Sequence, residues 1–216
     1  MTKEQIRSRI EEIGIIPGIR LSSAQDALFA AEAISSGGIP IVEVTMTVPG
    51  AIKVISELAR SSSELVVGAG TISDVETASR CLDAGAMFLT APGLDLKIVE
   101  FALKKKTVVF PGAMTPSEII TAWKAGADFV KVFPCSALGG ASYIKALKRP
   151  FPEIPLIASG GVNQNTATDL IRAGAMALGI GRDLIQPAAI HKRERGWIRE
   201  LAGRYLEMVA FARNPE

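Results

Sequence analysis

A short phrase recurs four times along this sequence of 216 residues, and it constrains the fold more than any other feature. Each copy contains the end of a helical segment, then a glycine, then an apolar run. The glycine suits a helix end because it tolerates positive φ, and the apolar run suits a strand buried on both faces of a parallel sheet. The glycines lie 47, 41 and 48 residues apart, at Gly38, Gly85, Gly126 and Gly174. Each interval has room for about two β–α units.

Further apolar runs lie between these phrases, so the sequence predicts eight strands. The additional runs span 14–20, 65–71, 107–113 and 155–161. Segments with helical spacing separate the strands, and most begin with Ser, Thr, Asp or Asn as an N-cap. They include 23–34, 74–84, 115–125 and 163–173. This alternation predicts an α/β fold, a (β/α)₈ TIM barrel with an extra N-terminal helix, in a single domain over residues 1–216. A doubly wound open sheet is the alternative fold.

Composition argues against several functional classes. The 24 basic and 22 acidic residues give a net charge of +2 without a basic stripe, so we expect no nucleic-acid partner. We also expect no membrane association and a cytoplasmic location, because no apolar run is long enough to span a bilayer and the start, "MTKEQIRSRIEE", reads as an amphipathic helix. His191 is the sole histidine, and Cys81 and Cys135 lack metal-ligand spacing. We therefore expect neither a serine–histidine triad nor a metal or other cofactor.

Two ionisable residues stand inside apolar strands. Glu43 lies in "PIVEVT" and Lys131 in "FVKVFP". Because strand side chains alternate, both should face the barrel interior, at the strand ends where TIM barrels hold their active sites. An unpaired buried charge is costly, so such residues pair or lose their charge. One interpretation is an internal ion pair that only holds strands together.

The functional interpretation makes Lys131 a Schiff-base nucleophile. Removing an amine from water favours its neutral, nucleophilic form, although a nearby ionised Glu43 would oppose this. A ketone condensed on Lys131 would form an iminium that withdraws electrons and allows an adjacent carbon–carbon bond to break. Glu43 is the acidic residue placed to move protons during these steps.

A second feature predicts an anion site at the ends of the last two strands. "ASGGVNQNT" presents Ser159, Gly160 and Gly161 before a predicted helix, an arrangement that offers backbone N–H groups to a phosphate. Arg182, in "GIGRDL", could add a bidentate contact. The alternatives are an ordinary glycine turn and a surface salt bridge between Arg182 and Asp183 or a neighbour.

Three more residues complete the expected pocket. Thr71, in "GAGT", offers a hydroxyl to a small carboxylate, with strand-end capping as the alternative. Pro92 and Phe133 are expected to form walls, although plain core residues would look the same.

The motifs together resemble a known family. They are "EVTMTVPGA", "VGAGTI", "APGLD", "FPGAMTPSE", "VKVFP", "RPFPEIPLIASGGV" and "AGAMALGIG". In this order, and over about residues 10–210, the chain resembles the class I aldolases that cleave 2-keto-3-deoxy-6-phosphogluconate and 4-hydroxy-2-oxoglutarate. The resemblance implies a homotrimeric TIM barrel that releases pyruvate, with Lys131 as the Schiff-base lysine and Glu43 as general acid/base. It also implies that Thr71 helps to hold the pyruvate carboxylate.

The chain departs from the family pattern at two positions. Many members have an arginine that grips the carboxylate where this chain has Thr47, which leaves Arg20, at the end of the first strand, as a substitute. Members that bind a sugar phosphate usually have a serine where this chain has Arg182. That arginine could strengthen binding of a dianion, favour a distal carboxylate, or fill the pocket.

The sequence therefore predicts reversible cleavage of a 2-keto-3-deoxy acid, foremost 2-keto-3-deoxy-6-phosphogluconate, to pyruvate and glyceraldehyde 3-phosphate. Cleavage of 4-hydroxy-2-oxoglutarate or of 2-keto-3-deoxy-6-phosphogalactonate is the alternative within this chemistry. Two other classes stay open at this point: a phosphate-binding barrel isomerase or synthase, and a non-catalytic ligand-binding or assembly barrel.

Overall fold

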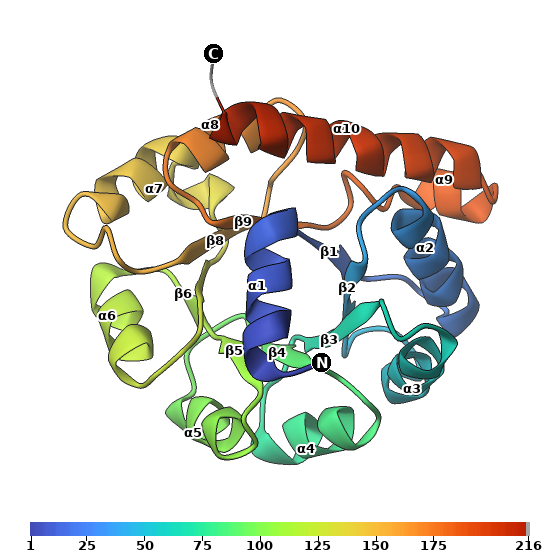
Figure 1. Ribbon diagram of the computed structural model, residues 1–216, viewed down its shortest axis with the longest axis horizontal. Helices are drawn as coiled ribbons and strands as arrows, with labels where there is room; N and C mark the ends of the chain where they lie inside the picture. The colour runs from blue at the N-terminus through green and yellow to red at the C-terminus, as the bar shows by residue number, and fades with distance from the viewer. Residues whose placement is uncertain (215–216) are drawn as a thin grey trace.

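A parallel sheet wound into a barrel forms the centre of the computed structural model, which describes residues 1–214 (Figure 1). All neighbouring strands pair in parallel, in the order β5-β4-β3-β2-β1-β9-β8-β7-β6. The strands are β1 (Ile15–Ile19), β2 (Ile41–Thr45), β3 (Val66–Gly70), β4 (Phe88–Thr90), β5 (Val108–Phe110), β6 (Gly112–Ala113), β7 (Val130–Val132), β8 (Leu156–Ser159) and β9 (Ala177–Ile180). The predicted TIM barrel is confirmed, and the open sheet was wrong.

The fifth predicted strand is divided, which gives nine labelled strands in place of the predicted eight. Pro111 separates β5 from β6 and has no N–H to donate to a ladder. β5 pairs with β4, and β6 pairs with β7. The backbone N–H of Lys131 also donates to the carbonyl of Pro111 at 2.9 Å. The barrel is therefore closed through one continuous segment of chain.

Helices surround the barrel on the outside (Figure 1). They are α2 (Ala24–Ser36), α3 (Ala51–Ser61), α4 (Val75–Asp83), α5 (Leu96–Lys104), α6 (Pro116–Lys124), α7 (Ala141–Lys148), α8 (Ala167–Arg172), α9 (Pro187–His191) and α10 (Arg195–Arg213), with a short 3₁₀ turn η1 (Ser136–Leu138). Ser23, Asp74 and Thr115 accept a backbone N–H at the first turn of α2, α4 and α6, as predicted. Among residues 1–214, no helix is both long and apolar enough to cross a bilayer.

The helix predicted over 163–173 begins later than expected. The Asn163 side chain accepts the backbone N–H of Asn165 at 2.9 Å, and the Asn163 carbonyl accepts the N–H of Thr166 at 3.1 Å. Such local bonds stabilise a turn in competition with a helix. α8 therefore starts at Ala167, several residues beyond the glycine pair.

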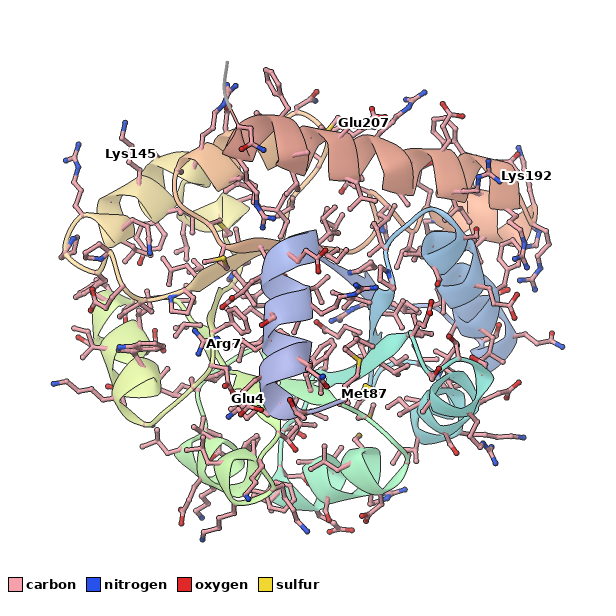
Figure 2. The ribbon with its side chains drawn as sticks, viewed as in Figure 1. Glu4, Arg7, Met87, Lys145, Lys192 and Glu207 are labelled. Atoms are coloured by element: carbon pink, nitrogen blue, oxygen red, sulfur yellow. The ribbon has the colours of Figure 1, made fainter. Side chains whose placement is uncertain are left out.

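α1 (Lys3–Ile13) lies across the barrel at the end where the strands begin (Figure 2). Its Ile6 and Ile10 are buried, and Lys3 pairs with Asp128 at 2.9 Å. The guanidinium of Arg7 lies 5.6 Å from the ring centroid of Phe129. α1 thus covers the end of the barrel opposite the strand ends at which an active site is expected.

Candidate active site

A cavity of about 340 Å³ opens among the C-terminal ends of the strands. Its lining comes from β1, β2, β7, β8 and β9 and from the loops that follow them. The predicted site residues in this lining are Arg20, Glu43, Lys131, Phe133, Ser159, Gly160, Gly161 and Arg182. Residues from distant parts of the sequence therefore meet where the fold places a TIM-barrel site.

Lys131 projects into this cavity from β7. Val130 and Val132 on either side of it are fully buried, as alternation predicts for residues that face the helices. The Lys131 side chain is 12% exposed and that of Glu43 is 7% exposed. The Lys131 Nζ lies 3.7 Å from Glu43 Oε1 and 3.4 Å from the hydroxyl of Thr90. The amine is thus largely withdrawn from water yet accessible from the cavity.

One glycine on β3, Gly70, makes room for the Glu43 carboxylate. β2 and β3 pair with Glu43 opposite Gly68 and with Thr45 opposite Gly70. A Cβ added to Gly70 would lie 1.9 Å from Glu43 Oε1, far inside van der Waals contact. The "GAGT" motif therefore has a steric role, because any larger residue at this position occupies the place of the carboxylate.

We expect Gly70→Ala to displace Glu43 and to lower turnover about 100-fold, the scale expected when a reacting group moves by about 1 Å. Steady-state release of pyruvate, the product that the family resemblance implies, measures the effect, and circular dichroism confirms folding. Gly203→Ala is the matched control, since a Cβ there meets nothing within 4 Å. Full turnover in Gly70→Ala would show that the carboxylate position is not critical.

Hydroxyl groups and one arginine gather beside the ends of β1 to β3. Arg20 Nη2 donates to Thr71 Oγ1 at 3.4 Å. Thr45 donates to the carbonyl of Ile19 at 2.9 Å and lies 2.7 Å from the hydroxyl of Thr47. Thr71 and Thr47 are outside the cavity lining, but each contacts a residue that lines it.

Thr71 also adopts an unusual backbone conformation, with a φ of 62°. A β-branched residue rarely adopts positive φ, and such strain tends to occur at functional sites. In this conformation Thr71 directly follows β3 and meets Arg20.

The glycine pair after β8 adopts positive φ, 88° at Gly160 and 78° at Gly161. The Ser159 carbonyl accepts the N–H of Cys135 at 2.7 Å, and the Gly160 carbonyl accepts that of Ser136 at 3.0 Å, so this turn is pinned to the loop after β7. Within residues 1–214, the N–H groups of Gly161 and Val162 donate to no backbone carbonyl. They are backbone donors at the cavity edge, and they belong to a loop because α8 begins later.

Two of the predicted residues, Arg182 and Pro92, are both exposed but differ in their position relative to the cavity. Arg182 is exposed, lines the cavity, and forms no ion pair in the part of the chain that the structure describes. Pro92 is exposed and lies outside the lining, whereas Phe133, the other expected wall, lines the cavity.

Thr90, whose hydroxyl meets the lysine amine, was not among the predicted site residues. The alternation of side chains along β4 could have identified Thr90. Phe88 faces the barrel interior, and the residue two positions later faces the same way. Phe88 stacks on Phe110 with ring centroids 5.2 Å apart, and a Cβ at Gly68 would collide with the Phe88 ring.

The two cysteines are buried, and neither lines the cavity. Burial raises the pKa of the Cys81 and Cys135 thiols to about 11, so both are protonated at neutral pH and are poor nucleophiles. In residues 1–214, no three His, Cys, Asp or Glu side chains are grouped as metal ligands.

Comparisons with known proteins place the chain in one family. The family model "KDPG and KHG aldolase" matches residues 6–201. The 2-dehydro-3-deoxy-phosphogluconate aldolase of Pseudomonas aeruginosa is 31% identical over 212 residues, 96% of each chain. The KHG/KDPG aldolase of Escherichia coli is 29% identical over 174 residues, 81% of each chain.

A solved structure adds a chemical parallel. The KDPG aldolase of Legionella pneumophila, with pyruvate captured as a covalent carbinolamine, superposes with a TM-score of 0.85 at 30% identity, over 92% of this chain and 97% of that one. The extent of the family match and the similarity to these relatives lead to one assignment. This chain belongs to the KDPG and KHG aldolase family.

Proposed function

We propose that this aldolase reversibly cleaves 2-keto-3-deoxy-6-phosphogluconate to pyruvate and glyceraldehyde 3-phosphate through a Schiff base on Lys131. The observation that carries this proposal is the position of the Lys131 amine, nearly buried, open to the cavity and 3.7 Å from the Glu43 carboxylate. The relatives' names support the substrate, and the carbinolamine captured in the Legionella enzyme supports the covalent route.

The first stage builds the iminium. Lys131 first passes one proton to Glu43, and its neutral amine then attacks the C2 carbonyl. An N–C2 bond forms, the carbonyl π electrons move to oxygen, and this oxygen takes the proton that the attacking nitrogen loses. The resulting carbinolamine loses its hydroxyl as water when Glu43 supplies a proton. A protonated iminium remains, and its positive nitrogen attracts electrons from the neighbouring carbons.

The second stage breaks the C3–C4 bond. Glu43 takes the proton of the C4 hydroxyl, C4 becomes the aldehyde, and the bonding pair moves toward the iminium to give an enamine. Protonation of the enamine at C3 and addition of water then release pyruvate and restore Lys131. One carboxylate can serve as acid and base in turn because each proton it takes is returned later.

Two groups of residues, in the cavity lining or in contact with it, suit the two ends of the substrate. We assign the pyruvate carboxylate to Arg20 and Thr71, with Thr47 adjacent through Thr45. Ser159 and the backbone N–H groups of Gly161 and Val162 suit the distal phosphate, and Arg182 adds a positive charge at the mouth. Phe133 forms a wall of the cavity, and Pro92 would contact only a substrate that extends beyond the lining.

Borohydride trapping tests the mechanism. Incubation with pyruvate and borohydride should add one reduced pyruvyl group to the Lys131 peptide, as seen by mass spectrometry. An intact Lys131 peptide would reject the mechanism and favour the interpretation of Lys131 and Glu43 as an ion pair only.

We expect Arg182→Ser to raise the KM for 2-keto-3-deoxy-6-phosphogluconate about 10-fold, the scale of one lost charge-assisted contact. The kcat should change little, because the guanidinium would bind the distal anion equally in the ground and transition states. The control is Lys192→Ser, because Lys192 is an exposed cation on the outer surface (Figure 2). An unchanged KM would remove Arg182 from phosphate binding.

The second candidate substrate is 4-hydroxy-2-oxoglutarate, because a guanidinium also pairs well with a distal carboxylate. 2-Keto-3-deoxy-6-phosphogalactonate is the third. Comparing kcat/KM for the three substrates, in the native protein and in Arg182→Ser, ranks them. A larger loss for 4-hydroxy-2-oxoglutarate than for the phosphorylated acids would favour the second candidate.

We propose further that the chain works as a homotrimer of single-domain barrels in the cytoplasm, without a metal or other cofactor and with the keto acid as its ligand. Family membership supports the trimer. Light scattering coupled to gel filtration should give about three times the mass of one chain, 22.8 kDa.

A further inference from the structure

Thr90 is the last residue of β4, and its side chain faces the barrel interior rather than the helices. The residue is 1% exposed. Its hydroxyl oxygen lies 3.4 Å from the Nζ of Lys131, which belongs to β7, 41 positions further along the chain. No role in the sequence-based site was assigned to it.

The amine of Lys131 therefore has two oxygen neighbours of different chemistry. Glu43 Oε1, at 3.7 Å, is a proton carrier, whereas the Thr90 hydroxyl, at 3.4 Å, stays neutral throughout the reaction. Both distances are long for a hydrogen bond, and contacts of this kind tighten when a substrate is bound. Thr90 is the nearer of the two.

The number of N–H groups on the lysine nitrogen falls during the reaction. A neutral amine has two. When the N–C2 bond has formed and water has left, the iminium nitrogen has one N–H and a positive charge. That single N–H is better directed at an oxygen that is not needed elsewhere, because Glu43 must take the proton of the C4 hydroxyl.

We infer that Thr90 is a positioning residue for the Schiff base, and that its hydroxyl accepts the single N–H of the Lys131 iminium. This bond fixes the plane of the iminium against the C3–C4 bond and leaves Glu43 free to move protons. The inference rests on the proposed Schiff-base function of Lys131.

Three variants at this position test the inference. Thr90→Val keeps the branched shape and removes the hydroxyl, whereas Thr90→Ser keeps the hydroxyl and removes the methyl. Thr90→Ala removes both. Thr121→Val, on the exposed surface of α6, is the matched control. The readouts are the rate of borohydride trapping with pyruvate and the steady-state kcat and KM.

We expect Thr90→Val to lower the trapping rate and kcat about 10- to 100-fold, the loss that follows when a hydrogen bond to a charged group is removed. Thr90→Ser should stay within about threefold of the native protein, because serine supplies the same acceptor. The KM should change less than kcat, since the bond forms only after condensation.

Trapping of Thr90→Val at the native rate would overturn the inference and leave the Schiff base itself intact. Equal losses in Thr90→Ser and Thr90→Val would also overturn it, because packing of the methyl would then be responsible. If Thr90→Val fails to fold, comparing Thr90→Ala with Thr90→Ser still measures the effect of removing the hydroxyl. Failure of the native protein to react with pyruvate would reject the proposed function, and the inference with it.

Discussion

Replacing Lys131 with methionine is expected to abolish covalent capture of pyruvate and to lower turnover by at least about 10⁴-fold, the scale for removal of a covalent nucleophile. Methionine has a similar length and suits an apolar strand, so it removes the amine with little change in shape. Without the amine no iminium forms, and the C3–C4 bonding pair has no electron sink. Intact-mass measurement after borohydride treatment and an assay of pyruvate release give the two readouts.

Lys145→Met is the matched control for this variant. Lys145 is exposed on α7 and points away from the barrel (Figure 2), so its loss should change neither readout. Retained capture in Lys131→Met, or capture at another lysine, would contradict the assignment.

Stability measurements separate the proposed catalytic role of Lys131 from its role as an ion-pair partner. Removing Lys131 alone leaves the Glu43 carboxylate, on a side chain that is 7% exposed, without its cation, so the free energy of unfolding should fall. Lys131→Met combined with Glu43→Gln removes both charges and should recover stability without recovering activity. If the ion pair has only a structural role, Lys131→Met should lose stability but still react with pyruvate at the native rate, through a residue elsewhere on the chain.

The barrel could be predicted because its signal is repeated along the chain. A glycine followed by an apolar run at Gly38, Gly85, Gly126 and Gly174 marks every second strand, and each local cue agrees with the others. The differences between the structure and the predicted elements are local. Pro111 divides a strand that the apolar pattern alone presents as continuous, and the Asn163 side chain delays a helix that the periodicity starts too early.

The active site was only partly predictable, because alternation gives a direction and not a distance. Alternation placed Lys131 and Glu43 inward, but their separation depends on how the barrel closes between β2 and β7. The same limit explains Thr90, which contacts the amine across the interior, and Pro92, which lies outside the cavity lining. The contact of Thr71 with Arg20 depends on a positive φ that no residue type other than glycine signals.

Glu43→Gln is expected to slow cleavage by about 10²- to 10⁴-fold, the range for loss of a general acid/base, while the protein stays folded. Glutamine occupies nearly the same volume beside Gly70, so the steric fit that places residue 43 is retained. It cannot take a proton from the C4 hydroxyl or supply one to the enamine. Exchange of the pyruvate methyl protons in deuterium oxide, followed by NMR, isolates this step because it needs no aldehyde.

A control variant and a comparison with Lys131→Met show which step depends on Glu43. Glu57→Gln, exposed on α3, should exchange these protons at the native rate. Glu43→Gln should still be trapped by borohydride after long incubation, because the amine is present, yet it should exchange protons slowly. Exchange at the native rate would remove Glu43 from proton transfer. If both trapping and exchange were lost, Glu43 would instead be required for the steps that build the iminium. The predicted pattern, slow exchange with trapping retained, assigns to Glu43 the proton transfer at carbon that follows formation of the iminium.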